Sequence, residues 1–290
     1  MNAVRFGEYA ASAMNFFRAL RKKNSRMRDA QVNQVNDATE FYQSLLQFME
    51  EDFDEQAQKK SKSKKAKDEN NLIRRLFYGE EKSSRTCMSC LLTSTTTTPI
   101  NCIRLDLEKD ATIQEMLAVY AQEEVLRGDE KSFCESCRRK TITCKRLALT
   151  KLPNILVFMV KRFEWVKSGQ EDLMKKVKLL DHCKFAAEIN FKQWPHLYKP
   201  DARNRKHMDS SYKLYAVLVH TGPDSEGGHY IACVLDDGGR WHMIDDNVIK
   251  PVKTNDVLRL PAYQLFYKKE AIQTIKRGHQ DRKNRPMTTD

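Results

Sequence analysis

Two Cys-x-x-Cys pairs constrain this chain more than any other feature of its sequence. The pairs are Cys87–Cys90 and Cys134–Cys137. They offer four thiolates, the usual tetrahedral ligand set of a structural Zn²⁺. Residues 91–133 separate them, which is far more than a compact zinc ribbon allows, so a long folded excursion must bring the pairs together. With all four positions filled by protein, the metal would be structural, with no open site for chemistry.

The alternative reading of these residues is four unliganded thiols in a reducing compartment. The chain has eight cysteines, no signal-peptide pattern and no apolar run of the roughly 20 residues that a membrane span needs. In such a chain the pairing favours metal over disulfides. We therefore expect a cytoplasmic and/or nuclear protein without a membrane segment. Cys102, Cys144 and Cys183 are expected to be ordinary buried thiols.

The net charge of +12 first indicates a nucleic-acid partner. Three short stretches account for more than this excess: 18–28, 59–67 and 276–285. The remainder of the chain is slightly acidic, which disfavours a dedicated nucleic-acid binder. The run at 59–67, KKSKSKKAK, is typical of a solvated insertion, and it is also compatible with nuclear import.

The hydrophobic pattern predicts an α+β fold, with two early helices followed by a run of strands. A helix is expected over 31–53, with Ala38, Phe41, Leu45 and Phe48 on one face and Asp37 with Glu40 as a capping box. A second helix over 112–127 would be capped by Thr112 and Glu115. The TSTTTT run at 93–98 is typical of a loop or an edge strand. Further strands are expected at 101–107, 155–160, 213–220, 229–235, 241–244 and 263–268.

A hairpin is predicted to bring a histidine and an aspartate together. Asp-Gly and Gly-Gly at 236–239 lie between two apolar runs, which is typical of a β-hairpin. A turn over 236–239 places His229 opposite Asp246, and one bulged residue in the turn pairs it with Asp245. A carboxylate beside an imidazole fixes the tautomer and stabilises the imidazolium, as a nucleophile-activating pair requires. A structural salt bridge between strands is the plainer alternative.

Several motifs in order resemble the ubiquitin-specific proteases, the papain-like cysteine peptidases that remove ubiquitin. Gly228-His229-Tyr230, Trp241 and Asp245-Asp246-x-Val248 resemble their histidine box. The runs 213–220, 152–163 and 263–267 resemble their palm strands. Residues 36–41, NDATEF, resemble the helix start Q-Q-D-A-x-E-F, and the two Cys-x-x-Cys pairs match the zinc-bearing fingers. The resemblance covers roughly residues 14–268.

This resemblance implies a papain-like fold of thumb, fingers and palm around ubiquitin or a ubiquitinated protein. It implies His229 as general base and Asp245 as its orienting partner, with Asp246 assisting. Asp37 and Glu40 would meet the arginine-bearing tail of ubiquitin, while Gly227, Gly228 and Tyr230 would line the substrate site. The implied parts are a thumb remnant (1–53), a lysine-rich insertion (54–69), fingers (70–150), a palm (151–268) and a basic tail (269–290).

The family's nucleophile box, of the type G-N-T-C-Y-x-N-S, is missing from this sequence. No cysteine precedes Cys87, and Cys233 lies four residues after His229, about 13 Å along an extended strand. That distance is too long for proton transfer. The first hypothesis is therefore a deubiquitinase whose sequence is truncated at its N-terminus, and the chain as given is expected to be inactive. The second is a pseudo-deubiquitinase that binds ubiquitin or a partner without cleaving it. A basic, zinc-stabilised nucleic-acid binder is the third.

Overall fold

The structure is a computed structural model of the chain, and it describes residues 13–23, 37–60, 71–167, 174–201, 210–222 and 227–270. Two compact units are present, Met1–Arg75 and Leu76–Asp290. The division falls inside the short helix α5 (Leu72–Phe77), so α5 links the two units. Among the described residues, no helix is long and apolar enough to cross a membrane.

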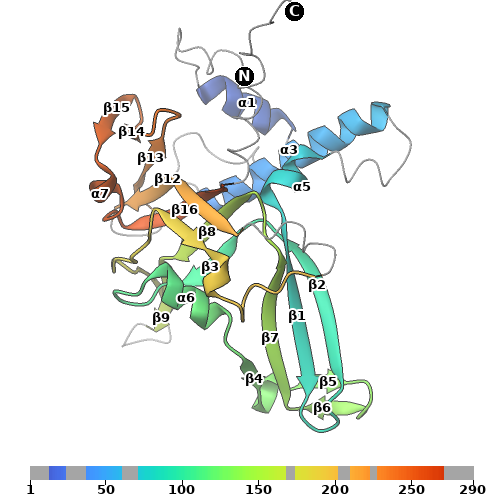
Figure 1. The fold of residues 1–290 in the computed structure, drawn as a ribbon. Coiled ribbons are helices and arrows are strands. Elements are labelled where there is room, and N and C mark those ends of the chain that lie inside the picture. The colour runs from blue at the N-terminus through green and yellow to red at the C-terminus, as the bar shows by residue number, and fades with distance from the viewer. Residues whose placement is uncertain are drawn as a thin grey trace, which may run out of the picture. The chain divides into compact units, whose positions relative to one another are not determined.

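The described part of the first unit contains two longer helices, α1 (Ala13–Lys23) and α3 (Ala38–Lys60), which contact each other (Figure 1). Of the expected helix over 31–53, residues 31–36 lie outside the described part. The buried face of α3 is formed by Tyr42 and Leu46, and Phe41, Leu45 and Phe48 are only partly buried. The predicted apolar face was therefore wrong by about one residue, because the packing partners of the helix select a neighbouring stripe of its surface.

Helix α3 also extends past the predicted end at residue 53, into the segment expected to be an unpacked insertion. Its last turns are held by Arg74, whose Nε lies 2.6 Å from Glu50 Oε1 and whose Nη2 lies 2.6 Å from Asp54 Oδ2. The side-chain amide of Asn71 donates to the carbonyl of Glu50 at 3.0 Å. These contacts hold the helix as far as Asp54, since Glu50 and Asp54 are one turn apart and share a single arginine.

A four-stranded sheet in the order β2-β1-β7-β4 forms the elongated part of the second unit (Figure 1). The threonine-rich run is β2, an exposed edge strand paired only with β1, so the edge-strand alternative is confirmed. A short hairpin, β5 with β6, lies at the far end of the long strands. The strand bounds are β1 Gly79–Cys87, β2 Thr93–Ile100, β4 Glu124–Leu126, β5 Ser132–Cys134, β6 Arg139–Thr141 and β7 Thr143–Lys151.

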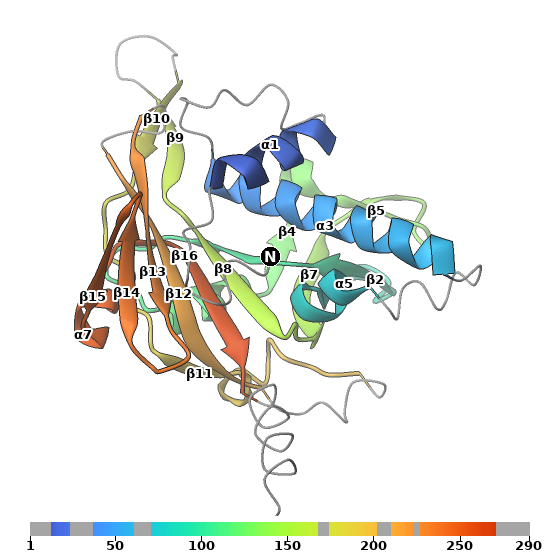
Figure 2. The ribbon, with the colours of Figure 1, turned by 90° about the horizontal axis from the view of Figure 1, so that it is seen from above.

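The larger sheet has the order β15-β14-β13-β12-β16-β8-β3, with β11 paired to β12 (Figure 2). Strand β8, which lies between β16 and the edge strand β3, is buried on both faces from Leu156 to Val160, as its continuous apolar run predicts. A separate hairpin pairs β9 with β10. The bounds are β3 Ile103–Asp106, β8 Ile155–Lys161, β9 Phe163–Lys167, β10 Met174–Lys178, β11 Glu188–Asn190, β12 Ser211–Thr221, β13 His229–Leu235, β14 Trp241–Asp245, β15 Val248–Val252 and β16 Ala262–Lys269.

Helix α6 (Ile113–Tyr120) packs its buried Ile113, Met116 and Leu117 into the core of the larger sheet. The predicted capping box of Thr112 and Glu115 is confirmed, since each side chain bonds the other's backbone N–H. The helix ends at Tyr120 and not at Arg127, because residues from Glu124 onward pair with β7 as β4. The described residues of this unit also include three short helical segments: α7 Thr254–Val257 and the 3-10 turns Gly128–Glu130 and Phe191–Gln193.

Candidate active site and metal centre

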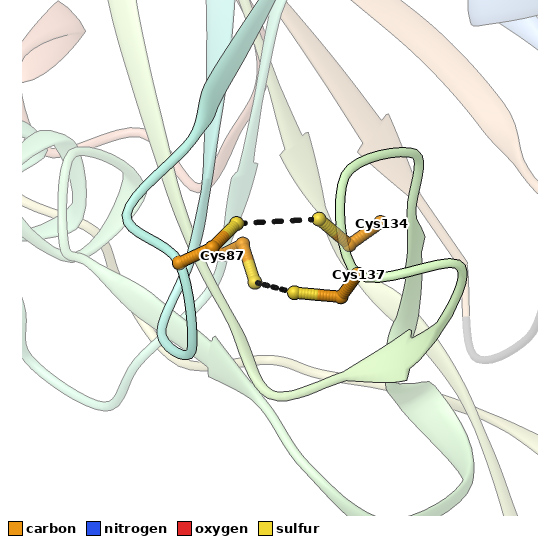
Figure 3. A group of neighbouring side chains, drawn as sticks. Cys87, Cys134 and Cys137 are labelled. Atoms are coloured by element: carbon orange, nitrogen blue, oxygen red, sulfur yellow. Dashed lines mark hydrogen bonds between the residues drawn. The ribbon is translucent and has the colours of Figure 1, made fainter.

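The four cysteines of the two Cys-x-x-Cys pairs converge at the far end of the four-stranded sheet (Figure 3). Cys87 ends β1 and Cys134 ends β5, so each pair begins where a strand stops. In both turns the carbonyl of the first cysteine accepts an N–H from the residue four positions later, Leu91 at 2.9 Å and Arg138 at 2.8 Å. The two knuckles thus have the same backbone geometry and face each other.

The sulfur positions fit a tetrahedral metal. Cys87 Sγ lies 3.9 Å from Cys137 Sγ, and Cys90 Sγ lies 3.6 Å from Cys134 Sγ. All four sulfur atoms lie within 4.8 Å of one another. Four sulfurs about 2.3 Å from a common centre at tetrahedral angles are about 3.8 Å apart. These residues therefore form a closed group of four thiols that can hold one metal ion, as the spacing predicts.

Two of these thiols are prepared for ionisation by their surroundings. The hydroxyl of Thr141, 3.2 Å from Cys87 Sγ, and nearby backbone N–H groups lower the pKa of Cys87 to about 5. A backbone N–H at Leu92 lowers the pKa of Cys90. Thiolates are the metal-binding form, and the hydrogen bond with Cys90 instead raises the pKa of Cys137 to about 12, so the surroundings do not favour ionisation of all four thiols equally. Thr141 was not predicted from the sequence, where nothing distinguishes it from neighbouring threonines.

The β13–β14 hairpin has a different register from either one predicted. Leu235 pairs with Trp241 and Ala232 with Ile244, so the loop comprises five residues, 236–240. It is closed by Asp236, whose N–H donates to the carbonyl of Arg240 and whose Oδ1 accepts from the N–H of Arg240, both at 2.9 Å. The predicted turn over 236–239 missed this side-chain closure, so the predicted opposition of His229 to Asp246 or Asp245 was wrong by one or two positions.

His229 and Asp245 are in contact even though the register differs from the predicted one, because they contact each other diagonally across the two strands. Continuing the register places the turn residue Asn247 opposite His229, and Asp245 lies two residues before it on the same face. His229 Nε2 lies 2.5 Å from Asp245 Oδ1. The hydrogen bond to Asp245 is the main cause that raises the pKa of His229, and the charge of Asp246 adds to it. The arrangement orients the ring and leaves Nδ1 for another partner.

Asp246 occupies the turn between β14 and β15, with a left-handed backbone at φ 49°. This conformation is uncommon for a residue other than glycine, although aspartate tolerates it better than most. The ligand atoms of His229, Asp245 and Asp246 lie within 4.8 Å of one another. Both carboxylates therefore face the imidazole, with Asp245 in direct contact.

The segment that enters β13 is fixed by contacts that the sequence did not reveal. Lys178 Nζ, on β10, donates to the carbonyls of His220 at 3.0 Å and Gly222 at 2.6 Å. The hydroxyl of Thr221 donates to the carbonyl of His229 at 3.0 Å. A Cβ on Gly228, at φ +147°, would lie 2.4 Å from His220 Nε2. These contacts hold the backbone just before the candidate base, and no sequence signal separates Lys178 from the neighbouring lysines.

The remaining predicted site residues are placed as follows. Gly227 and Gly228 directly precede β13, and residues 223–226 lie outside the described part. The ring of Tyr230 packs 4.9 Å from that of His220. In the first unit, Asp37 caps α3, since its Oδ1 accepts from the N–H of Thr39 at 2.6 Å, and Glu40 is exposed in the first turn. A substrate role for these five residues stays a prediction.

Three cysteines outside the metal group, Cys144, Cys183 and Cys233, are buried in surroundings that oppose ionisation. Cys233 is fully buried in β13, and burial raises its pKa. Burial likewise raises the pKa of Cys183. Burial, together with a hydrogen bond from its Sγ to Glu123, raises the pKa of Cys144. The thiolate is the reactive form, so these environments oppose nucleophilic chemistry.

Comparison with known proteins agrees with this geometry. The profile of the ubiquitin carboxyl-terminal hydrolase family matches residues 7–267. Ubiquitin carboxyl-terminal hydrolase 25 of Arabidopsis thaliana is 30% identical over 198 residues, which are 68% of this chain and 28% of the relative. Ubiquitin carboxyl-terminal hydrolase 2 of Homo sapiens is 32% identical over 205 residues, 69% of this chain and 31% of the relative. The chain thus spans less than a third of the length of these two proteins.

Solved structures of similar fold include the SAGA Ubp8/Sgf11/Sus1/Sgf73 DUB module. In its complex with monoubiquitin, the matching chain is 25% identical with a TM-score of 0.70, covering 89% of this chain and 53% of that one. In its complex with ubiquitin aldehyde the TM-score is 0.69, with the same identity and coverage. From the matched family profile, these relatives and the shared fold, we conclude that the chain belongs to the ubiquitin carboxyl-terminal hydrolase family, the ubiquitin-specific proteases, and has their papain-like α+β fold.

Proposed function

We propose that this chain is the ubiquitin-binding and base-carrying part of a thiol-dependent deubiquitinase. The observation that carries the proposal is the contact between His229 and Asp245 at 2.5 Å, beside the glycines that precede β13. Family membership and the ubiquitin-bound state of the similar SAGA modules support ubiquitin or a ubiquitinated protein as the partner.

In this proposal His229 Nδ1 takes the proton of a cysteine thiol as the thiolate attacks the carbonyl at the end of the ubiquitin tail. The resulting imidazolium, stabilised by Asp245 and by the charge of Asp246, then gives the proton to the leaving amine. His229 next activates water to hydrolyse the thioester. The thiol would come from polypeptide outside these 290 residues, and without it the chain is expected to be inactive.

The four-thiol group has the composition and spacing of a structural Zn²⁺ site, and we assign Zn²⁺ to it. Bound there, the metal would supply stability by joining the turn after β1 to the turn after β5. Cys87, Cys90, Cys134 and Cys137 fill all four positions, so the metal has no part in the chemistry.

Asp37 and Glu40 are assigned to the arginine-bearing tail of ubiquitin, because both are acidic and exposed at the start of α3. This role is compatible with the capping contact of Asp37, since a carboxylate has two oxygens and several acceptor positions. Gly227, Gly228 and Tyr230 are assigned to the substrate site next to His229. We propose a cytoplasmic and/or nuclear location, which rests on the pattern of cysteines in the sequence.

A second candidate function is ubiquitin binding without cleavage. The observation that favours it is the lack of an activated thiol among the described residues near His229. In this case the His229–Asp245 pair would serve only the structure of the hairpin.

Both candidates predict ubiquitin binding, which calorimetry on the purified chain can test. We expect saturable binding of ubiquitin, and a weaker affinity for ubiquitin whose C-terminal tail has been removed. Asp37→Asn with Glu40→Gln should weaken binding of intact ubiquitin, while Glu188→Gln, an exposed acid on β11, serves as the matched control. Absence of binding, or equal affinity for tailed and tailless ubiquitin, would contradict the proposed function.

A further inference from the structure

The first residues of β13, which include His229, pair with β12 only. His229 lies opposite Thr221 on β12, and the hydroxyl of Thr221 donates to the carbonyl of His229 at 3.0 Å. The ladder between β13 and β14 begins further along the strand, where Ala232 pairs with Ile244. The hydrogen bond between His229 and Asp245 therefore joins two strands that are not paired at this point. The position of the imidazole depends on how the end of β12 is held.

Residues 220–222 and 227–229, which we call the neck, lie closer together than side chains allow. A Cβ on Gly222 would lie 2.8 Å from Gly228 Cα, and a Cβ on Gly228 would lie 2.4 Å from the carbonyl oxygen of Thr221. Both glycines have a positive φ, +110° and +147°, that other residues rarely adopt. Because neither glycine has a side chain that could fix the neck by packing, contacts to its backbone have to fix it.

Lys178, at the end of β10, makes two such contacts. Its Nζ donates to the carbonyl of His220 at 3.0 Å and to the carbonyl of Gly222 at 2.6 Å. An ammonium group has three donors, so one group can hold both carbonyls. Strand β10 belongs to the two-stranded sheet with β9, which is separate from the larger sheet that contains β12. The side chain of Lys178 therefore joins two sheets, through charged hydrogen bonds that are roughly twice as strong as neutral ones.

The backbone next to Lys178 is anchored to the larger sheet by Arg162. The N–H of Leu179 donates to the carbonyl of Arg162 at 2.7 Å. The buried guanidinium of Arg162 donates through Nη1 to the carbonyls of Leu179 at 3.1 Å and Asp181 at 2.9 Å. Its Nε donates to the carbonyl of Ala262, the first residue of β16, at 2.8 Å. Lys178 therefore extends toward the neck from a fixed base.

We propose that Lys178 is a positioning residue of the candidate active site. By holding two carbonyls, its ammonium fixes the neck and so keeps His229 within hydrogen-bond reach of Asp245. The inference rests on the proposed role of His229 as a base, but its test measures the imidazole directly and needs no ubiquitin. Failure to bind ubiquitin would contradict the proposed function alone, and failure of the test below would contradict the role of Lys178 alone.

The test is NMR titration of His229 in the zinc-loaded chain, with Lys178→Met as the main variant. Asp245 raises the pKa of His229 above 6.5, so weakening this contact should make the pKa fall toward 6.5. Removal of a positive charge would by itself raise the pKa of a nearby histidine. The two effects have opposite signs, so a fall reports the position of the ring and not the charge of Lys178. Asp245→Asn gives the size of the fall when the contact is lost completely.

A double variant separates this role from a general effect on the fold. In Asp245→Asn the contact is already lost, so adding Lys178→Met should lower the pKa of His229 no further. Lys178→Gln has a shorter amide that can still donate to one carbonyl, and it should cause a smaller fall than Lys178→Met. This second variant replaces Lys178→Met in every comparison if Lys178→Met does not fold, as read by thermal unfolding.

The matched control is Lys176→Met, on the same face of β10. Lys176 Nζ lies 5.1 Å from the ring centroid of Phe163, so the variant removes a neighbouring ammonium that does not hold the neck. It should not lower the pKa of His229. Three results would overturn the proposal: an unchanged or raised pKa in folded Lys178→Met, an equal fall in Lys176→Met, or a further fall when Lys178→Met is added to Asp245→Asn.

Discussion

The metal centre and the candidate active site are both built from short motifs, yet they differ in completeness. The four thiols of the metal group all come from this chain, and their spacing already fits the ion. The candidate active site has a base and an orienting carboxylate, but no described thiol lies in an activating environment beside them. The first site is therefore closed and self-sufficient, while the second, under the proposed function, supplies only the base and its orienting carboxylate.

This difference teaches how each site depends on the fold around it. Two tight turns build the metal group, and each is fixed by local backbone hydrogen bonds. The His229–Asp245 contact depends instead on the register of a hairpin, on a five-residue loop and on Lys178 at the entry to β13. Changes to the metal group should therefore affect stability most, and changes at the hairpin should affect geometry and ionisation.

The largest effect is expected from loss of the metal. The wild-type chain should contain about one Zn²⁺, and Cys134→Ser should abolish tight binding, because three ligands no longer close the site. Structural zinc contributes apparent binding free energies of about 10 kcal/mol or more to small zinc domains, so the two turns that carry the Cys-x-x-Cys pairs should lose protection from proteolysis. Metal analysis measures the zinc content, and limited proteolysis measures the protection.

Cys102→Ser is the matched control, because Cys102 lies outside the four-thiol group. It should keep the metal and the protection. Normal zinc content in Cys134→Ser would contradict a closed site of four thiols.

The next largest effect is expected at the entry to the candidate active site. Gly228→Ala places a Cβ 2.4 Å from His220 Nε2 and from the Thr221 carbonyl, on a backbone that only glycine adopts freely. Strain and clash together should lower the free energy of unfolding by about 3 kcal/mol. Gly239→Ala has a left-handed backbone but open space, and it should lose only about 1 kcal/mol. If urea denaturation shows the same loss of unfolding free energy in both variants, the close approach of the backbone at Gly228 does not contribute to stability.

A smaller effect is expected from the loop that sets the hairpin register. Hydrogen bonds from the Arg240 N–H and from His242 hold the pKa of Asp236 well below its usual range. Since the folded pKa is depressed, this stabilisation is present above the ordinary pKa of 3.8 and is lost as the pH falls. In Asp236→Asn the midpoint of thermal unfolding should therefore fall less steeply as the pH is lowered through the acid range. An unchanged pH profile of thermal unfolding would contradict this role.

The smallest effect is a change in ionisation. The pKa of His229 is raised above its ordinary value of 6.5 by Asp245. Asp245→Asn should lower it, and Asp246→Asn should lower it less, because Asp246 acts through charge alone. The stabilising contribution of the wild-type pair is full below pH 6.5 and is lost as the pH rises through the folded pKa. NMR titration of the histidine signals gives the pKa of His229 in the wild-type chain and in both variants. An equal fall of this pKa in the two variants would contradict the diagonal contact.

The sequence predicted the parts of this molecule that local spacing determines. The four thiols, the capping box of Thr112 and Glu115 and the strand His229–Leu235 all agree with the structure. Each depends on residues a few positions apart or on a run of uniform character. The family, too, was recognisable from short motifs in their order along the chain.

The features that the sequence could not predict depend on tertiary partners. The buried face of α3 is set by what packs against it, and the ion pairs of Arg74 hold the helix across its predicted end at residue 53. The end of α6 is set by the pairing of β4 with β7. The hairpin register is set by side-chain hydrogen bonds of Asp236, which no hydrophobic pattern reports. The diagonal contact of His229 with Asp245 followed from that register.

The most direct test of the candidate active site is reaction of the zinc-loaded chain with ubiquitin that carries a C-terminal electrophile, read by intact-protein mass spectrometry. The account predicts that ubiquitin binds without forming a covalent adduct, because none of the eight cysteines is an activated nucleophile beside His229. An adduct with ubiquitin at any of these cysteines would contradict the account, and peptide mapping would then identify the nucleophile.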